Sequence, residues 1–405
     1  MKVLLINKFL YAKGGDAIST LQTGRLLAAR GHYVVYWGMA HAMNPDYPYQ
    51  ELFIEYTDLT KPGNIKRRIK IASNILFSFD ARAKINELVS DIKPDIVHLN
   101  NFAHQISPSI LQVFRRHNIP AVMTLHDYKM VCASYLMVNN GKICEACKNG
   151  KYNMCFLRKC VKDSRFKSLL NTIEMYLHHK ILHLYDLIDV YIAPSIFLRQ
   201  KLYDMGFNKK IVHLPNFVNG TDAHPPIKTK NNRFLYFGRL SPEKGLETLI
   251  KAAAGMDIEL RIVGTGSHEQ TLRQLAVTEG INNVHFMGYR SGTELAKEIS
   301  EALAVIVPSE WYENNPRAVL ESFAAGLPVL GARIGGIPEL IIDHETGLTF
   351  KPGDVVDLRR TILYCVNNKE KVRNMGKQAQ QYVRKNFNPT KHYKILIDIY
   401  NSIRY

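Results

Sequence analysis

The sequence predicts an α/β protein built from two domains, each with a parallel β-sheet. Its 405 residues are too many for a single hydrophobic core. Short apolar runs alternate with helical patterns along the chain, which is typical of parallel strands connected by helices. A polar, proline-containing stretch at 221–232 reads as a linker. We therefore expect one domain over residues 1–218, a second over 219–388, and a last segment over 389–405.

Composition excludes a fibrous protein and a membrane-spanning one. The chain is 46% hydrophobic and 22% charged, with no biased tract. No apolar run approaches the roughly 18 residues that a spanning helix needs. The first 15 residues have too short an apolar stretch for a signal peptide, so we read them as a strand and a turn. The expected location is the cytoplasm, with peripheral contact to the inner face of the membrane as a further option.

Positive charge is concentrated in the first half of the chain. Residues 1–220 hold 29 Lys and Arg against 16 Asp and Glu, a net of +13, whereas residues 221–405 hold 24 against 20, a net of +4. The net positive charge of the first half predicts an anionic partner, which can be phospholipid headgroups, a lipid diphosphate or nucleic acid. The densest run is 66–70, KRRIK, among isoleucines. It fits either a solvated helix face or a membrane-surface contact.

The first half reads as strands and helices in alternation. Predicted strands lie at 3–7, 33–36, 95–99, 121–125, 190–195 and 211–216. Predicted helices lie between the first two strands, at 106–117, at about 167–187, and after Ser195.

The second half repeats this alternation. Predicted strands lie at 233–238, 259–264, 284–289 and 303–308, and helices begin near Ser267, at Pro316 and near Pro389. Asn315 has the residue type and position of an N-cap for the helix that Gly326 ends.

Polar residues and glycines follow several strands of the first half. Ligands of open α/β sheets bind beyond the carboxyl ends of the strands. The residues so placed are Gly14, Gly15, Asn100, Asn101, His126 and Asp127. A glycine pair can let a phosphate or sugar approach the backbone, although an ordinary turn needs the same residues. A lone histidine can equally be structural.

In the second half, strand ends carry cations and carboxylates. Arg239 and Lys244 follow one strand and could bind diphosphate oxygens, although such residues are also common on solvated surfaces. Gly264 opens a shortened glycine-rich turn. Glu313 precedes an apolar helix and Glu321 lies within it, where a carboxylate needs a partner such as a hydroxyl pair.

These motifs together resemble those of the retaining GT-B glycosyltransferases of family four. The resemblance rests on four motifs. The first is the pair Glu313 and Glu321, with seven residues between them, which lies between Pro308-Ser309 and Ala325-Gly326. The others are the run from Gly238-Arg239 to Lys244-Gly245, His126 after its strand, and Pro215-Asn216 with Val218 before the linker. It extends over nearly the whole chain. It implies two Rossmann-like domains facing a cleft, with a C-terminal helix that returns to the first domain.

The resemblance also implies an activity, which is hexosyl transfer from a nucleotide-sugar donor such as a UDP- or GDP-sugar, with retention of configuration. Arg239 and Lys244 would take the diphosphate, Glu321 the ribose, and His126 the sugar from the first domain. Glu313, with N–H groups near Asn314 and Asn315, would hold the donor-sugar hydroxyls. Gly14, Gly15, Gly264, Met287 and Tyr289 would line the donor site, and Asn100, Asn101 and Asp127 the acceptor side. No nucleophile is evident and no Asp-x-Asp motif occurs, so a front-face reaction that needs no metal cofactor is expected.

Five of the six cysteines fall between 132 and 160. Cys144 and Cys147 have the spacing of a zinc knuckle, and Cys155 and Cys160, with Cys132 as a fifth candidate, could complete a structural zinc site. Reduced thiols without a metal, redox chemistry and an iron–sulfur centre are the alternatives. Some polysaccharide-building members of the resembled family carry such an insert.

The acceptor is predicted only by class. The basic first half and the insert favour a lipid-linked or oligosaccharide acceptor in surface-glycan synthesis, near an anionic membrane. A GT-B enzyme with a soluble sugar or sugar-phosphate acceptor is the alternative. A nucleic-acid-binding protein is the remote one, because no base-readout motif is visible and the aromatic residues lie mostly within strand patterns.

Overall fold

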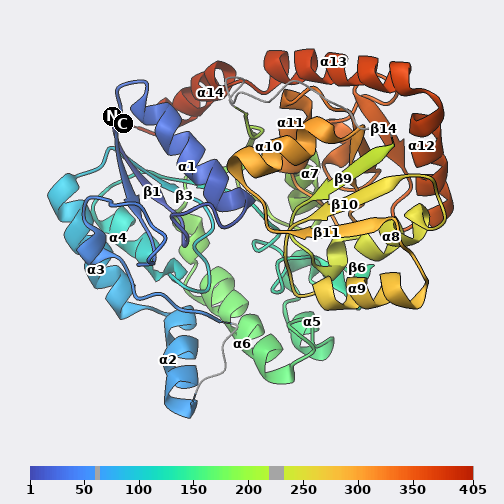
Figure 1. Ribbon diagram of the computed structural model, residues 1–405. Coiled ribbons are helices and arrows are strands. Elements are labelled where there is room, and N and C mark those ends of the chain that lie inside the picture. The colour runs from blue at the N-terminus through green and yellow to red at the C-terminus, as the bar shows by residue number, and fades with distance from the viewer. Residues whose placement is uncertain (60–63, 219–231, 405) are drawn as a thin grey trace.

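The structure is a computed structural model that describes residues 1–59, 64–218 and 232–404. Most of the linker predicted at 221–232 lies outside these residues. Two parallel six-stranded sheets form the framework (Figure 1). This agrees with the predicted α/β class.

The first sheet has the strand order β2-β1-β3-β4-β7-β8, with every pair parallel. Its strands are β1 (Lys2–Ile6), β2 (Tyr33–Trp37), β3 (Ile96–Leu99), β4 (Ala121–Thr124), β7 (Val190–Ala193) and β8 (Ile211–His213). The central strands are buried on both faces, which is why they read as continuous apolar runs.

The second sheet has the order β11-β10-β9-β12-β13-β14 and is also parallel throughout. Its strands are β9 (Arg233–Phe237), β10 (Glu259–Val263), β11 (Val284–Gly288), β12 (Ala304–Val307), β13 (Val329–Ala332) and β14 (Gly347–Phe350). A small antiparallel pair, β5 (Val138–Asn139) and β6 (Lys142–Ile143), lies in the cysteine-rich segment.

Helices connect the strands of both sheets. In the first half they are α1 (Gly15–Ala28), α2 (Ile65–Leu76), α3 (Phe79–Ile92), α4 (Leu111–Arg116), α5 (Asn153–Leu157), α6 (Arg165–Tyr176) and α7 (Ile196–Asp204). In the second half they are α8 (Leu246–Ala253), α9 (Glu269–Thr278), α10 (Gly292–Glu301), α11 (Arg317–Ala324), α12 (Val355–Asn367), α13 (Lys369–Asn386) and α14 (Pro389–Asn401). No helix among the described residues is both long and apolar enough to cross a membrane.

The last helix packs on the first sheet, although it follows the second sheet in sequence (Figure 1). Leu396, Ile399 and Tyr400 are buried against strands β1, β3 and β4. The Tyr400 hydroxyl lies 2.6 Å from His98 Nδ1, and the Tyr393 hydroxyl lies 2.8 Å from His32 Nε2. The end of the chain therefore covers one face of the first sheet.

Two predicted helix boundaries in the first half of the chain were wrong. The helix expected at 167–187 ends at Tyr176 and continues as a π-turn, Leu177–Ile181, in which buried His178 contacts the Leu76 carbonyl at 2.7 Å. The helix expected at 106–117 begins only at Pro108, because the backbone at Ser107 has a φ of 72°.

The cap of one helix in the second half also differs from the prediction. Pro316 rather than Asn315 is the N-cap of α11, and the Asn315 carbonyl accepts a hydrogen bond from Asn216 at 3.2 Å. The helix after Gly264 has His268 as its N-cap, next to the predicted position near Ser267.

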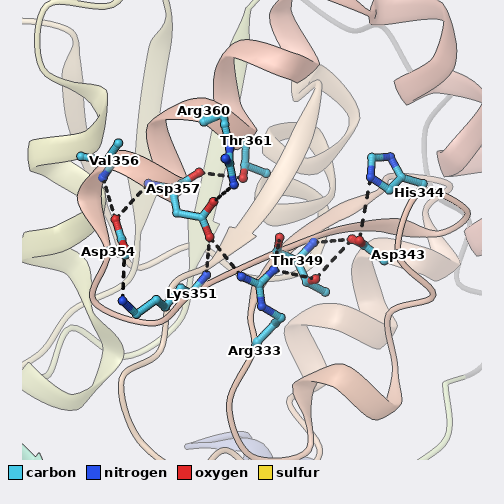
Figure 2. Close-up of polar contacts among 10 residues, drawn as sticks. All are labelled: Arg333, Asp343, His344, Thr349, Lys351, Asp354, Val356, Asp357, Arg360 and Thr361. Carbon is cyan, nitrogen blue, oxygen red and sulfur yellow. Dashed lines mark hydrogen bonds and ion pairs between the residues drawn. The ribbon is translucent and has the colours of Figure 1, made fainter.

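A polar network joins β13, β14 and α12 at one edge of the second sheet (Figure 2). Asp354 caps α12 by accepting from the backbone of Val356 and Asp357. Asp357 in turn accepts from Arg333 at 3.1 Å and from the Lys351 backbone at 2.8 Å. The hydrogen bond from the Lys351 backbone lowers the pKa of Asp357 below its usual value and outweighs the opposing effect of the partial burial of this carboxyl group. These contacts fix the start of α12 beside the edge strand β14.

Candidate active site

Each sheet has one point at which its strand order reverses. In the first sheet this point lies between β1 and β3, and in the second between β9 and β12. Loops that leave neighbouring strands in opposite directions open a crevice there, where α/β proteins bind ligands. The predicted residues Gly14 and Asn100 follow β1 and β3, and Lys244 and Glu313 follow β9 and β12. The fold therefore brings the predicted residues to both reversal points.

Glu313 and Lys244 form an ion pair at the reversal point of the second sheet. Lys244 Nζ lies 2.6 Å from Glu313 Oε1, and the Ser309 hydroxyl donates to the same oxygen at 2.6 Å. Burial alone would raise the pKa of Glu313, but Lys244 and Ser309 outweigh it, so this pKa is lowered. The carboxylate is therefore anionic at neutral pH. Lys244 also lies over the Trp311 ring, at 5.2 Å.

The turn that carries Lys244 packs closely against the end of β12. Gly245 has a φ of 68°, and a Cβ atom there would lie 2.0 Å from the Pro308 carbonyl oxygen. Only glycine meets both demands without strain. The Lys244-Gly245 motif thus sets the contact that places the ammonium group beside Glu313.

The other two charged candidates also have partners. Arg239, which is largely exposed, donates to Glu243 at 2.8 Å and to Ser241 at 3.2 Å. Glu321 accepts from Arg317 at 2.9 Å, and Arg317 donates to Gln22 of α1 at 2.9 Å. A bound diphosphate or ribose would have to exchange with these pairs.

His126 lies beyond β4 in the first sheet. Its Nε2 atom is 2.9 Å from Oδ1 of the buried Asn100. Burial lowers the pKa of His126, and Lys8 adds to this effect against the opposing charge of Asp16. The imidazole is therefore neutral at pH 7 and can exchange a hydrogen bond with a hydroxyl group.

Asp127 and Asn101 lie in neighbouring loops. Asp127 Oδ1 accepts from the Lys129 backbone at 2.9 Å, and burial raises the pKa of this carboxyl group. The Asn101 backbone N–H donates to Asn7 Oδ1 at 2.9 Å, and its carbonyl accepts from the Lys8 backbone at 2.9 Å. The loops after β1 and β3 are thus bonded to each other.

Asn314 joins the carboxyl ends of the two sheets. Its side-chain amide donates to the Leu125 carbonyl at 2.9 Å and accepts from the Ser195 hydroxyl at 2.9 Å. A Cβ atom on Gly336 would lie 1.8 Å from the Asn314 carbonyl oxygen, so the Gly335-Gly336 turn packs directly on this residue. Glu313 and His126 are the sequence neighbours of Asn314 and Leu125, so this bond joins the two loops that carry them.

The remaining donor-site candidates lie on the second sheet and α1. Gly14 and Gly15 begin α1, and the Arg317 side chain lies 3.7 Å from where a Cβ of Gly15 would be. Gly264 follows β10, and its N–H donates to the carbonyl of Gly288, which lies between Met287 and the exposed Tyr289. Asn315 is buried, and its Oδ1 atom has no hydrogen-bond partner among the described residues. Such an acceptor is suited to a ligand hydroxyl.

The five cysteines of the insert, Cys132, Cys144, Cys147, Cys155 and Cys160, line one small cavity. Hydrogen bonding from Cys147 lowers the pKa of Cys132 to about 6, and Cys155 is similarly paired with Cys160. Cys144 instead accepts from Arg158 at 3.3 Å. Within the described part of the chain, no three His, Cys, Asp or Glu side chains are placed to hold a metal ion. The zinc site proposed for Cys144, Cys147, Cys155 and Cys160 stays a prediction.

Sequence reasoning missed the residues that support the site. Glu145, inside the cysteine-rich segment, accepts from Tyr312 at 3.0 Å and from Lys201 at 2.7 Å, so this segment contacts the residue before Glu313. Lys129 forms a buried ion pair with Glu174 of α6. Two features of the sequence could have indicated this pair. Lys129 lies two residues after Asp127, and Glu174 is the single acidic residue of its helix.

Comparison with known proteins identifies the family of this chain. Residues 13–221 match the model of Glycosyltransferase Family 4, and residues 221–382 match Glycosyl transferases group 1. The chain belongs to glycosyltransferase family 4. This family-4 enzyme is 24% identical to N-acetyl-alpha-D-glucosaminyl L-malate synthase of Bacillus anthracis, over 97% of this chain and 94% of the relative.

Two solved structures share the GT-B fold of this family-4 glycosyltransferase. Sucrose-phosphate synthase of Thermosynechococcus elongatus has a TM-score of 0.73 at 19% identity, covering 99% of this chain and 98% of its own. The HepE protein of Anabaena, solved with UDP-glucose, has a TM-score of 0.67 at 17% identity, covering 99% and 100%. The predicted GT-B fold and glycosyltransferase class are confirmed.

Proposed function

We propose that this glycosyltransferase moves a sugar from a UDP- or GDP-sugar to a lipid-linked or polysaccharide acceptor, with retention of anomeric configuration. One observation carries the proposal. The Asn314–Leu125 hydrogen bond brings the Lys244–Glu313 pair, at the reversal point of one sheet, to the end of β4 where His126 lies. A donor bound at this junction would meet cations, a carboxylate and a neutral imidazole at once.

Lys244 and Arg239 would bind the departing nucleoside diphosphate. Each now neutralises a carboxylate, Glu313 or Glu243, so the free enzyme holds its cations in ion pairs. A diphosphate offers more negative charge than either carboxylate and would compete for both cations. Fixed positive groups aimed at oxygens that gain charge during bond breakage stabilise the transition state.

Glu313 and Glu321 would hold hydroxyl groups of the donor. Glu313 is anionic for the reason given above, and it lies in the loop after β12, in contact with Lys244. Glu321 lies within α11, the helix that follows Glu313, and Arg317 of the same helix donates a hydrogen bond to its carboxylate. Charged acceptors of this kind suit a sugar and a ribose, because each ligand presents pairs of donors at fixed spacing.

His126 would contact the transferred sugar from the first sheet. Because its pKa is lowered, the ring is uncharged at pH 7 and adds no positive charge near the forming oxocarbenium-like centre. No protein nucleophile is assigned. In the front-face reaction that we propose, the leaving phosphate itself accepts the acceptor's proton. The basic first half favours an acceptor presented at an anionic membrane.

Nucleotide binding tests the donor assignment. We expect one of UDP, GDP and ADP to raise the melting temperature of the parent protein, since a ligand at 100 times its Kd adds about 2.7 kcal/mol of stability. The Arg239→Ala variant should lose this shift, and its turnover should fall about a hundredfold. Glu321→Ala should lose turnover to a similar extent.

Arg273→Ala is the matched control for Arg239→Ala. Arg273 is similarly exposed and pairs with Glu269 four residues earlier, but it lies on α9, away from both reversal points. It should keep the nucleotide shift. If all three nucleotides leave the parent unchanged, or if Arg239→Ala responds like Arg273→Ala, the assignment of the diphosphate site is wrong.

A further inference from the structure

The first two turns of α2 are exposed to an unusual degree. Every residue from Asn64 to Lys70 is exposed, including Ile65 at 73% and Ile69 at 63%. Four of these seven residues are Lys or Arg and none is acidic. Isoleucines exposed to this extent give up the free energy that burial would provide, so a partner surface is expected to cover them.

A second exposed apolar row lies on α6. Phe166, Leu169 and Ile173 are exposed at 58%, 40% and 45%, respectively. Their spacing of three and then four residues places them on one side of the helix. The opposite side carries the buried Glu174 and Met175. This helix therefore has an apolar row facing the solvent in addition to its buried side.

The two helices lie side by side, below the first sheet in Figure 1. The Arg68 guanidinium lies 5.5 Å from the centre of the Phe166 ring, and His178, just after α6, contacts the Leu76 carbonyl at the end of α2. We call their exposed surface the α2–α6 face. It consists of the apolar residues Ile65, Ile69, Phe166, Leu169 and Ile173 and the cations Lys66, Arg67, Arg68, Lys70, Arg165 and Lys167.

The charges of the α2–α6 face are almost entirely positive. Glu174 is the one acidic residue of the two helices, and it is buried in its pair with Lys129. Glu55 pairs with Lys70 at 3.1 Å, and exposed Asp163 precedes α6. The remaining cations of the face outnumber these two carboxylates. A helical surface that combines exposed bulky apolar residues with cations is suited to the interface of an anionic bilayer.

We propose that the α2–α6 face docks this enzyme on an anionic membrane, with the apolar side chains entering the headgroup region and the cations contacting lipid phosphates. A second copy of the chain is disfavoured because the same cations would repel, and a nucleic acid would leave the apolar row uncovered. The inference deepens the proposed function, on which it rests for the lipid-linked nature of the acceptor. Glu174 of α6 pairs with Lys129, and the Lys129 backbone donates a hydrogen bond to Asp127. Docking through α6 would therefore place the acceptor side of the site near the lipid.

Vesicle sedimentation tests the docking with the full-length protein. The parent is expected to pellet with vesicles of phosphatidylcholine containing about one-third phosphatidylglycerol, and not with phosphatidylcholine alone, and binding should weaken with added salt. Ile69→Ser/Phe166→Ser should lower the partition coefficient at least tenfold. Lys66→Glu/Arg67→Glu should lower it further, since each removed cation costs roughly fivefold.

Matched variants on the second half of the chain provide the controls. Val277→Ser/Val356→Ser replaces two side chains that are 75% and 77% exposed, and Lys371→Glu/Arg373→Glu reverses two exposed cations of α13. Both should bind vesicles like the parent. All variants should keep the nucleotide-induced thermal shift, so a failure of docking is distinguishable from a failure of the donor assignment.

Three outcomes would overturn the inference. The first is equal binding of the parent to vesicles with and without the anionic lipid. The second is unchanged binding by Ile69→Ser/Phe166→Ser. The third is absence of vesicle binding together with tight binding to a single-stranded oligonucleotide that Lys66→Glu/Arg67→Glu abolishes, which would assign the face to nucleic acid.

Discussion

Replacing Glu313 with glutamine is expected to lower the kcat of sugar transfer by about a hundredfold or more. The carboxylate is buried, is anionic at neutral pH, and holds Lys244 at 2.6 Å. Glutamine keeps the shape of the side chain but removes the charge that orients the ammonium group and would accept hydrogen bonds from the sugar. Release of the nucleoside diphosphate, measured with saturating donor once the donor base is known, reports this loss directly.

Glu310→Gln is the control for that experiment. Glu310 lies in the same loop and also accepts a side-chain hydrogen bond, from Thr248, but it does not contact Lys244. Its replacement should leave kcat within a few-fold of the parent. Comparable losses in the two variants would mean that the loop tolerates no change of charge, and near-normal kcat in Glu313→Gln would exclude Glu313 from the chemistry.

A double-mutant cycle measures whether Lys244 and Glu313 act on kcat as a pair or independently. Lys244→Met and Glu313→Gln are each expected to reduce kcat strongly, and the double variant should lose much less than the product of the two reductions. Residues in direct contact commonly show such coupling, whereas distant residues act independently. Independent effects would show that Lys244 and Glu313 serve different parts of the donor.

The reversal-point loops could be predicted from the sequence because their signals are local. Gly245 must be glycine where the backbone meets the Pro308 carbonyl, and the spacing from Lys244 back to Arg239 fits a single strand-to-helix turn. Glu313 and Glu321 are likewise set by one loop and one helix. The parallel sheets follow from continuous apolar runs, whose burial on both faces leaves no polar alternation.

Contacts between distant segments could not be predicted in this way. Nothing near Asn314 in the sequence indicates that its amide reaches Leu125, 189 residues away. The Cys144–Cys147 spacing likewise does not indicate that Cys147 lies within hydrogen-bonding reach of Cys132. The long helix predicted to continue past Tyr176 ends because His178 is drawn into a buried contact with Leu76, an interaction that no local propensity encodes.

Truncating Glu174 is expected to cost about 3–5 kcal/mol in the free energy of unfolding, because it leaves Lys129 as an uncompensated buried charge. Glu174 is fully buried and Lys129 is 4% exposed. The pair also holds the turn in which the Lys129 backbone binds Asp127, so Glu174→Ala should reduce turnover as well. Denaturant unfolding measures the loss. Glu269→Ala, which removes a more exposed pair with Arg273, should cost less than about 1 kcal/mol.

Acid should weaken this buried cluster in two stages. His104 lies 3.9 Å from Glu174, and burial lowers the pKa of His104 to about 3, whereas an unfolded histidine has a pKa of about 6.5. The neutral ring therefore contributes stability above pH 6.5 that is lost progressively as the pH falls toward 3. Burial would raise the pKa of Glu174, but the charge of Lys129 outweighs it and the pKa is lowered. The ion pair therefore contributes stability above the unfolded glutamate pKa of about 4.3, and this stability is lost as the pH falls below that value. The unfolding free energy of the parent should fall between pH 6.5 and 4.5 more steeply than that of His104→Gln, which cannot titrate. Equal slopes in the two proteins would show that His104 is not held neutral by its surroundings.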